Sequence, residues 1–306
     1  MPPLPPNRKP NTTSPACKAL CRRAGLCHDA GLAYFQSVNP LVLSLTAIAA
    51  YLATAIWQGR TDWRATPARP APVLLLGFAA VLLHGVLLYQ AIFRPGGLDL
   101  GLANSLSLVG WQLALLVLLA NLRQPLGIVI TGLLPVAALT VAGMHWQVAD
   151  RPLIAHTSWA LDTHIVVSLA AYSLLALAAI MALGLAVQDY RLRHHKPGPW
   201  LTVLPPLAVL EHLLFLFLAA GFALLTLALF AGLVFVHDLF AQHLVHKTVL
   251  SLLAWLVFAL LLWGRFRHGW RGRKAIRWTL AGFILLALAY FGSKTVLELV
   301  LGRHWG

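Results

Sequence analysis

The sequence predicts an all-α, polytopic membrane helix bundle with about eight transmembrane helices. The composition is the first evidence for this prediction. Of the 306 residues, 59% are hydrophobic and only 10% are charged, and the mean hydropathy is +0.78. A soluble globular domain has roughly 25% charged residues, so this chain lacks the polar surface of a soluble enzyme. Long apolar runs also recur along the chain, and about 20 helical residues cross the ~30 Å hydrocarbon core of a bilayer.

Eight apolar runs are expected to span the membrane. Several begin or end at Pro, Gly or charged residues, where a spanning helix is expected to stop. The segments between them are too short for a sizeable soluble domain, so residues 39–306 are predicted to form one membrane domain. In chain order, the predicted spans are Pro40–Trp57, Pro72–Phe93, Gly101–Asn121, Pro125–Gly143, Thr163–Val187, Glu211–Val236, Lys247–Gly264 and Trp278–Leu301.

Residues 1–38 are predicted to be a disordered, basic N-terminal tail. The tail is rich in Pro and lacks the arrangement of a signal peptide. It contains all three cysteines, Cys17, Cys21 and Cys27, whose spacing does not match the C-x-x-C pairs of zinc or redox sites. An alternative hypothesis is a mis-assigned start, with translation beginning at a non-Met codon near Val38.

The basic residues predict the orientation of the bundle. A net charge of +14 and a pI near 10.6 would suggest a nucleic-acid partner for a soluble protein. Here, thirteen of the 23 bases fall in one set of alternate loops and only four in the opposite set. Because short cytoplasmic loops are enriched in Lys and Arg, we expect a bacterial inner-membrane protein with both termini outside. The expected partner of these charges is membrane lipid, and nucleic acid is not expected.

Histidines gather near the predicted outer face, and one lies deep inside a span. His84 is twelve residues from Pro72, about 18 Å along the second span. Two imidazoles from different helices, surrounded by apolar side chains, can ligate haem iron. For each histidine the alternative is an interfacial residue that hydrogen-bonds headgroups or water. The sequence therefore predicts a site for haem b whose iron ligands come from among His164, His84, His237 and His246.

Two further side chains are candidate haem contacts. Trp111 lies about ten residues into the third span, where it could stack on a planar ligand or fill space between helices. Lys294 and Glu298 form an i, i+4 pair in the last span. Local pairing is the favoured interpretation, and a contact between Lys294 and a haem propionate is the alternative. No catalytic residue is predicted, because the chain has neither a phosphate-binding Gly-rich loop nor a C-x-x-C-H motif.

Two segments resemble a known family. WALDTHIVVSLAAYSLLALAAIMALGLAVQD, residues 159–189, contains a His that opens a span and is followed by a Ser and an Ala-Tyr. This arrangement resembles the cytochrome c assembly proteins of the CcsA, ResC and CcmC type. The C-terminal portion, from residue 246 to 293, includes GRFRHGWRGR and Ala-Tyr-Phe-Gly, and is similar to the YpjD-like inner-membrane branch. The resemblance covers roughly Pro72–Leu301.

The resemblance implies that haem is handled at the outer membrane face, in cooperation with a partner protein of cytochrome c assembly. It places His164 at the family's external haem-ligand position and His84 at a mid-span His of the YpjD-like branch. The family's Trp-rich external loop is replaced by FVHDLFAQHLVHKTVLSLLAW, which keeps Lys247, Thr248 and Trp255. We therefore expect a factor that holds or delivers haem, and not a complete synthase.

Two other functions fit the apolar, His-rich chain. A small-molecule transporter or channel could line an outer vestibule with histidine, and such a protein would be colourless when purified. A scaffold subunit of a membrane complex would bind no haem, and its histidines would be incidental. An absorption spectrum of the purified protein separates these alternatives from the haem hypothesis.

Overall fold

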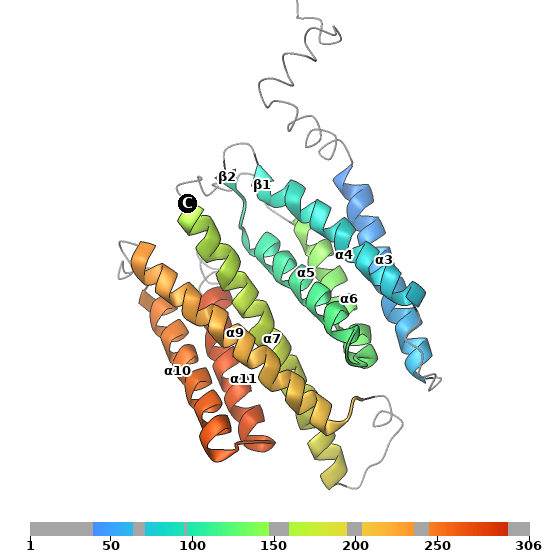
Figure 1. The fold of residues 1–306 in the computed structure, drawn as a ribbon. Helices are drawn as coiled ribbons and strands as arrows, with labels where there is room; N and C mark the ends of the chain where they lie inside the picture. Colours follow the sequence, from blue (N-terminus) through green and yellow to red (C-terminus); the bar gives the residue numbers. More distant parts are fainter. Residues whose placement is uncertain are drawn as a thin grey trace, which may run out of the picture.

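The fold is a bundle of long α-helices (Figure 1). The computed structural model describes residues 39–63, 71–94, 97–146, 159–194, 204–235 and 245–292. The α-helices in these ranges are α3 (Pro40–Trp63), α4 (Ala71–Ile92), α5 (Leu102–Asn121), α6 (Gly127–Gly143), α7 (Trp159–Arg193), α9 (Leu207–Phe235), α10 (Val245–His268) and α11 (Arg273–Ala287). Each predicted span overlaps one of these helices.

Short irregular elements complete the described chain. A two-residue antiparallel pair, β1 (Phe93–Arg94) and β2 (Gly97–Leu98), lies between α4 and α5. A 3₁₀ turn, η1 (Met144–Trp146), follows α6, and a π-helical turn, η2 (Leu288–Gly292), continues α11. The predicted tail at residues 1–38 and the end of the predicted last span, residues 293–301, lie outside the described residues.

Six helices in the described ranges are long and apolar enough to cross a membrane: α3, α4, α5, α7, α9 and α10. This confirms the prediction of a polytopic, all-helical membrane bundle. Helix α6 is apolar but has only 17 residues, and α11 has 15. Helix α7 is longer than its predicted span: it begins at Trp159 and continues to Arg193.

The helices form two neighbouring groups, α3 to α6 and α7 to α11, which meet along α5 and α7 (Figure 1). Partly buried hydrogen bonds cross this boundary. The hydroxyl of Ser173 on α7 donates to Oε1 of Gln112 on α5 at 2.6 Å, and the hydroxyl of Tyr290 on η2 donates to Oγ of Ser105 at 3.2 Å. Such bonds help to specify which helices associate, because apolar side chains contact lipid tails as favourably as they contact one another.

Small residues allow the closest helix contacts. Gly221 of α9 faces Leu175 of α7, and a Cβ atom added to Gly221 would lie 2.8 Å from the Leu175 Cγ and 3.1 Å from its backbone nitrogen. Only a residue without a side chain permits this approach. Around it, Leu175, Leu214 and Leu218 are completely buried. Close backbone packing therefore joins α7 to α9.

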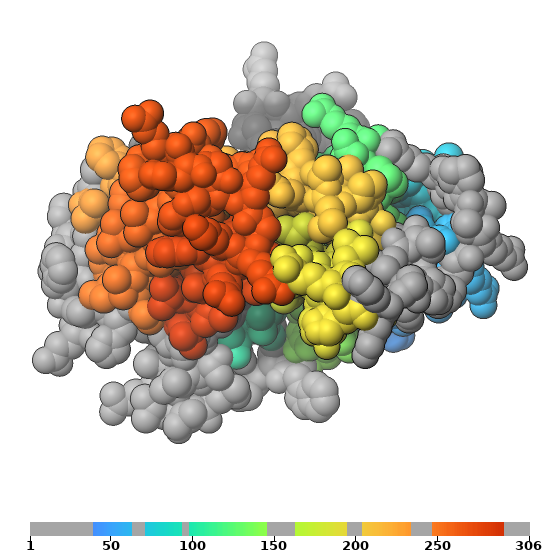
Figure 2. All heavy atoms as spheres, turned by 90° about the horizontal axis from the view of Figure 1, so that it is seen from below, coloured from blue at the N-terminus to red at the C-terminus, as the bar shows by residue number. Residues whose placement is uncertain are grey.

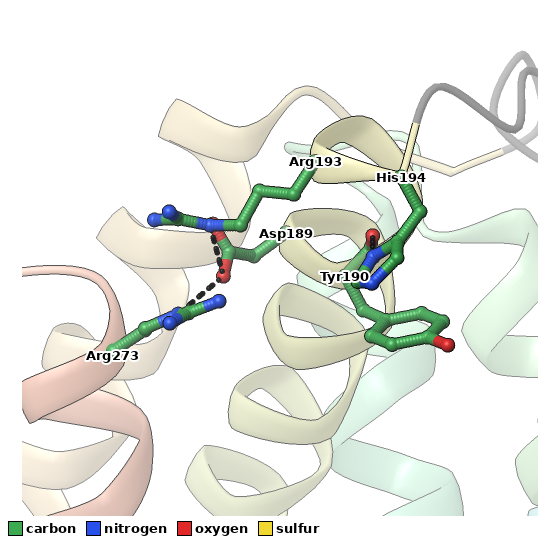
Figure 3. A network of polar contacts seen from close by, with 5 residues as sticks. All are labelled: Asp189, Tyr190, Arg193, His194 and Arg273. Carbon is green, nitrogen blue, oxygen red and sulfur yellow. Dashed lines mark hydrogen bonds and ion pairs between the residues drawn. The ribbon is translucent and has the colours of Figure 1, made fainter.

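One end of the bundle is basic, and we call it the basic end. It contains the last residues of α3, the α5–α6 connection, the end of α7, the start of α9 and the α10–α11 connection (Figure 1). In Figure 3, Arg193 and Arg273 converge on Asp189, and their Nε atoms lie 2.9 Å and 3.0 Å from its carboxylate oxygens. Because Arg273 begins α11 and Asp189 lies near the end of α7, this cluster joins the two helices.

A second carboxylate holds the α10–α11 connection. Glu211, near the start of α9, pairs with Arg265 at 2.7 Å and with Arg271 at 3.2 Å. The Arg265 guanidinium also lies 4.3 Å from the centroid of the Phe215 ring. Gly269 and Gly272 adopt positive φ angles of 63° and 55°, which allow the chain to turn between the two helices.

Candidate functional site

His84 is the centre of a buried polar cluster in the first helix group. It lies on α4, eight residues before Ile92, and so about 12 Å from the end of the helix that is opposite the basic end. Its Nδ1 atom is 3.1 Å from the Tyr51 hydroxyl of α3, and its Nε2 atom is 2.8 Å from Oγ of Ser107 on α5. All three side chains are completely buried. His84 therefore links three helices.

The hydrogen bonds of His84 compete with its predicted role as an iron ligand. An imidazole coordinates iron through the lone pair of one ring nitrogen and usually donates a hydrogen bond from the other. Both nitrogens of His84 are already engaged by hydroxyl groups. Coordination by His84 would therefore replace its bond to Tyr51 or its bond to Ser107.

His164 has a different environment, in the second turn of α7. Its ring packs against α9: a Cβ added to Gly232 would lie 3.3 Å from the His164 Cε1, and the backbone of Ala228, one turn earlier, also interacts with the ring. The Nδ1 atom of His164 is buried and has no hydrogen-bond partner among the described residues. Leaving such a polar atom buried costs roughly 1–3 kcal/mol. Among the candidate ligands whose side chains are described, His164 is thus the one with an unsatisfied nitrogen.

The other predicted site residues are described only in part. His237 and Lys294 lie outside the described residues, and for His246 only its position in the first turn of α10 is described. Trp111 donates its Nε1 hydrogen to the Val81 carbonyl at 2.8 Å, and its ring lies against Gly85 of α4. In this position Trp111 packs α5 against α4.

Sequence reasoning assigned no role to a cluster of aromatic residues near the α5–α7 boundary. The Tyr172 ring lies 5.4 Å from the ring of Phe283 and 6.4 Å from that of Tyr290, between centroids. The ammonium of Lys247 is 6.0 Å from the centroid of the Tyr290 ring. Tyr290 lies in the π-helical turn η2, and such turns frequently occur at functional sites. The signal was present in the sequence, since Tyr172 and Tyr290 each belong to an Ala-Tyr pair in the segments that carry the resemblance.

The arrangement suits a ligand held by few protein atoms. In the described part of the chain, no three His, Cys, Asp or Glu side chains come together in a group that could hold a metal ion. Iron in a porphyrin needs only one or two protein ligands, because the macrocycle supplies the rest. His164, whose Nδ1 atom has no hydrogen-bond partner among the described residues, is a candidate for such a contact. Tyr172 lies eight residues farther along α7, about 12 Å away along the helix axis.

Comparison with known proteins agrees with the resemblance noted in the sequence. Residues 73–301 match the family described as cytochrome C assembly protein. The inner membrane protein YpjD of Escherichia coli strain K12 is 31% identical over 267 residues, which cover 85% of this chain and 99% of that protein. The cytochrome c biogenesis protein CcsA of Synechococcus sp. strain CC9902 is 25% identical over 272 residues, covering 79% of this chain and 88% of that protein. No solved structure shows a significant match.

Proposed function

The chain belongs to the cytochrome c assembly protein family, and from this premise we propose that it is an integral membrane protein that holds or delivers haem during cytochrome c biogenesis. A relative similar over most of its length is named a cytochrome c biogenesis protein. Haem would supply the reactivity, and the protein would bind and orient it.

The observation that carries this proposal is the environment of His164. One nitrogen of its ring is buried without a hydrogen bond to any described residue. His164 lies near the start of α7, whose other end belongs to the basic end. Coordination of iron by this residue would offset the cost of that unsatisfied nitrogen. The backbone of Ala228 beside the ring is the kind of partner that fixes the orientation of a ligating imidazole.

A second iron ligand would come from among His84, His237 and His246. His84 would have to exchange one of its two hydrogen bonds, whereas His246 lies in the first turn of α10, the helix that also contributes Lys247. Two histidines would complete the coordination of six-coordinate haem iron. Trp111 and Lys294 are the proposed secondary contacts, to the porphyrin face and to a propionate respectively.

We further propose eight membrane spans, with both termini outside the inner membrane. Helix α6 is about 26 Å long, and α11 with η2 extends from Arg273 to Gly292, about 30 Å, so each is close to the thickness of the hydrocarbon core. The basic end would face the cytoplasm, as the enrichment of Lys and Arg in cytoplasmic loops requires. The haem site would then lie toward the outer face, where a partner protein of cytochrome assembly would receive or supply haem.

The test is the absorption spectrum of the full-length protein purified in neutral detergent from haem-replete cells. We expect a Soret band that His164→Ala reduces at least fivefold. His212→Ala is the matched control, because His212 is an exposed histidine on α9 near the basic end, and it should leave the band unchanged. A colourless preparation, or equal bands in both variants, would overturn the proposal.

A further inference from the structure

The α10–α11 hairpin carries a group of basic side chains that no acidic side chain balances. Asp189 and Glu211 pair with Arg193, Arg265, Arg271 and Arg273. Among the described residues, no carboxylate lies within ion-pair distance of Arg267, Lys274 or Arg277, and all three side chains are exposed. We call these three residues the unpaired cations, because none of them has a carboxylate partner among the described residues. The Lys274 ammonium does lie 5.6 Å from the centroid of the Trp270 ring.

On α10, Arg267 continues a stripe of exposed apolar residues. Val249, Leu253, Leu256, Leu260 and Trp263 are exposed and recur every three or four residues, which places them on one face of the helix. Arg267 follows Trp263 by four residues, one turn and about 6 Å farther along the same face. Because Trp side chains prefer the membrane–water interface, we expect Arg267 to lie at the level of the lipid headgroups.

Helix α11 repeats this pattern in the opposite chain direction. From Leu288, the first residue of η2, the exposed face continues on α11 through Ile284 and Ala281 to Arg277. Lys274 lies three residues farther toward the hairpin. Because α10 and α11 pack against each other and are joined by residues 269–272, the two apolar stripes end at the same end of the bundle. Seen from that end, the atoms of α10 and α11 form one continuous surface beside the end of α7 and the start of α9 (Figure 2).

From this placement, we propose that Arg267, Lys274 and Arg277 form a binding site for the phosphate group of an anionic phospholipid in the leaflet that meets the basic end. A guanidinium group can donate two parallel hydrogen bonds to phosphate oxygens. Trp263 would contact the lipid at the interface, and Phe266, which is 84% exposed, would insert beside it. The site is independent of haem binding.

A lipid fits this surface better than a polynucleotide or a free phosphate ion. The cations directly continue the membrane-facing apolar stripes, so the bilayer itself brings phosphate groups to them. Anionic leaflets attract basic residues close to a membrane. A soluble polyanion would instead be expected to contact cations that project away from the bilayer, without exposed side chains such as Phe266 and Trp263 beside them.

The experiment titrates full-length protein in neutral detergent with dioleoyl phosphatidylglycerol or with dioleoyl phosphatidylcholine. Native mass spectrometry measures how much lipid is retained, and a thermal unfolding assay measures the shift in Tm that the lipid causes. We expect retention of phosphatidylglycerol and not of phosphatidylcholine. Combined Arg267→Gln, Lys274→Gln and Arg277→Gln should weaken that binding at least tenfold. The matched control is combined Arg60→Gln, Arg123→Gln and Arg191→Gln, which removes the same charge from the same end and should change binding less than twofold.

Three results would overturn the site. Equal losses in the two triple variants would show that binding depends on net charge alone. Equal retention of the two lipids would show that the phosphate charge is not recognised. Displacement of phosphatidylglycerol by inorganic phosphate or by a single-stranded oligonucleotide would assign the surface to a soluble anion. Should the triple variant fail to fold, Arg277→Gln alone should weaken binding about threefold, and Arg277→Lys should restore part of it.

Discussion

The Tyr51 hydroxyl group lies 3.1 Å from Nδ1 of His84 in a region where both side chains are completely buried. Their rings meet edge to face, with centroids 5.8 Å apart. The other nitrogen of His84 is engaged by Ser107, so no polar atom of the imidazole lacks a partner. Buried polar groups are costly in a membrane unless they are satisfied, and this cluster therefore fixes the relative positions of α3, α4 and α5.

The first prediction concerns this cluster. Tyr51→Phe removes one hydrogen bond and should lower the free energy of unfolding by about 0.6–1.7 kcal/mol, the range found for hydrogen bonds between membrane helices. His84→Ala should cost about 2–4 kcal/mol, because it leaves a cavity and two buried hydroxyl groups that have lost a partner. Denaturant unfolding in detergent measures both effects. Tyr89→Phe, at an exposed position on α4, is the control, and an unchanged stability of His84→Ala would contradict the prediction.

The second prediction concerns the close approach of α7 and α9. In Gly221→Ala, the new methyl group would meet the Leu175 backbone nitrogen at 3.1 Å, so the helices must separate. We expect a loss of at least about 2 kcal/mol, within the range for overpacked cores. Gly132→Ala is a matched control inside α6, because no atom lies within 4 Å of the added methyl group. Unfolding transitions measured side by side should be lower for Gly221→Ala only.

The third prediction compares the two carboxylates at the basic end. Glu211 has 20% of its side chain exposed and pairs with Arg265, which is 22% exposed. Asp189 pairs with Arg193 and Arg273, which are each more than half exposed. Exposed ion pairs contribute at most about 1 kcal/mol, whereas a hydrogen bond to a charged group that is shielded from solvent contributes about 1.5–3 kcal/mol. Glu211→Gln should therefore lower Tm more than Asp189→Asn, and the opposite order would show that burial does not govern these pairs.

The positions of the helices could be predicted from the sequence because hydropathy reports transfer into lipid directly. Each predicted apolar run, from Pro40–Trp57 to Trp278–Leu301, overlaps a helix. The ends were less accurate: α7 extends past Val187 to Arg193, where Asp189 and Arg193 form an i, i+4 pair on the helix surface. Because α7 continues through these charged residues after its apolar run ends, hydropathy underestimates the length of the helix.

Side-chain partners could not be predicted in the same way. Helices such as α6 and α7 are apolar on all faces, and lipid tails are as apolar as leucine, so hydrophobic periodicity does not show which face meets another helix. The partners of His84 come from two other helices, and Tyr290 is 118 residues from Tyr172 in sequence. The histidines themselves could be predicted as candidates, because each is a rare polar side chain in an apolar segment.

The fourth prediction tests the haem ligand through a neighbour that is not itself a ligand, and it depends on the proposed function. In Gly232→Ala, the methyl group would lie 3.3 Å from Cε1 of His164, closer than ordinary van der Waals contact, so the imidazole must tilt or shift. We expect a shift of the Soret maximum or a severalfold loss of bound haem, measured by absorption and by pyridine haemochrome content. Gly184→Ala on α7 is the control, because its methyl group would meet only Leu210 at 3.7 Å. If Gly232→Ala leaves both spectrum and content unchanged, the His164 ring is not held in a ligand position by α9.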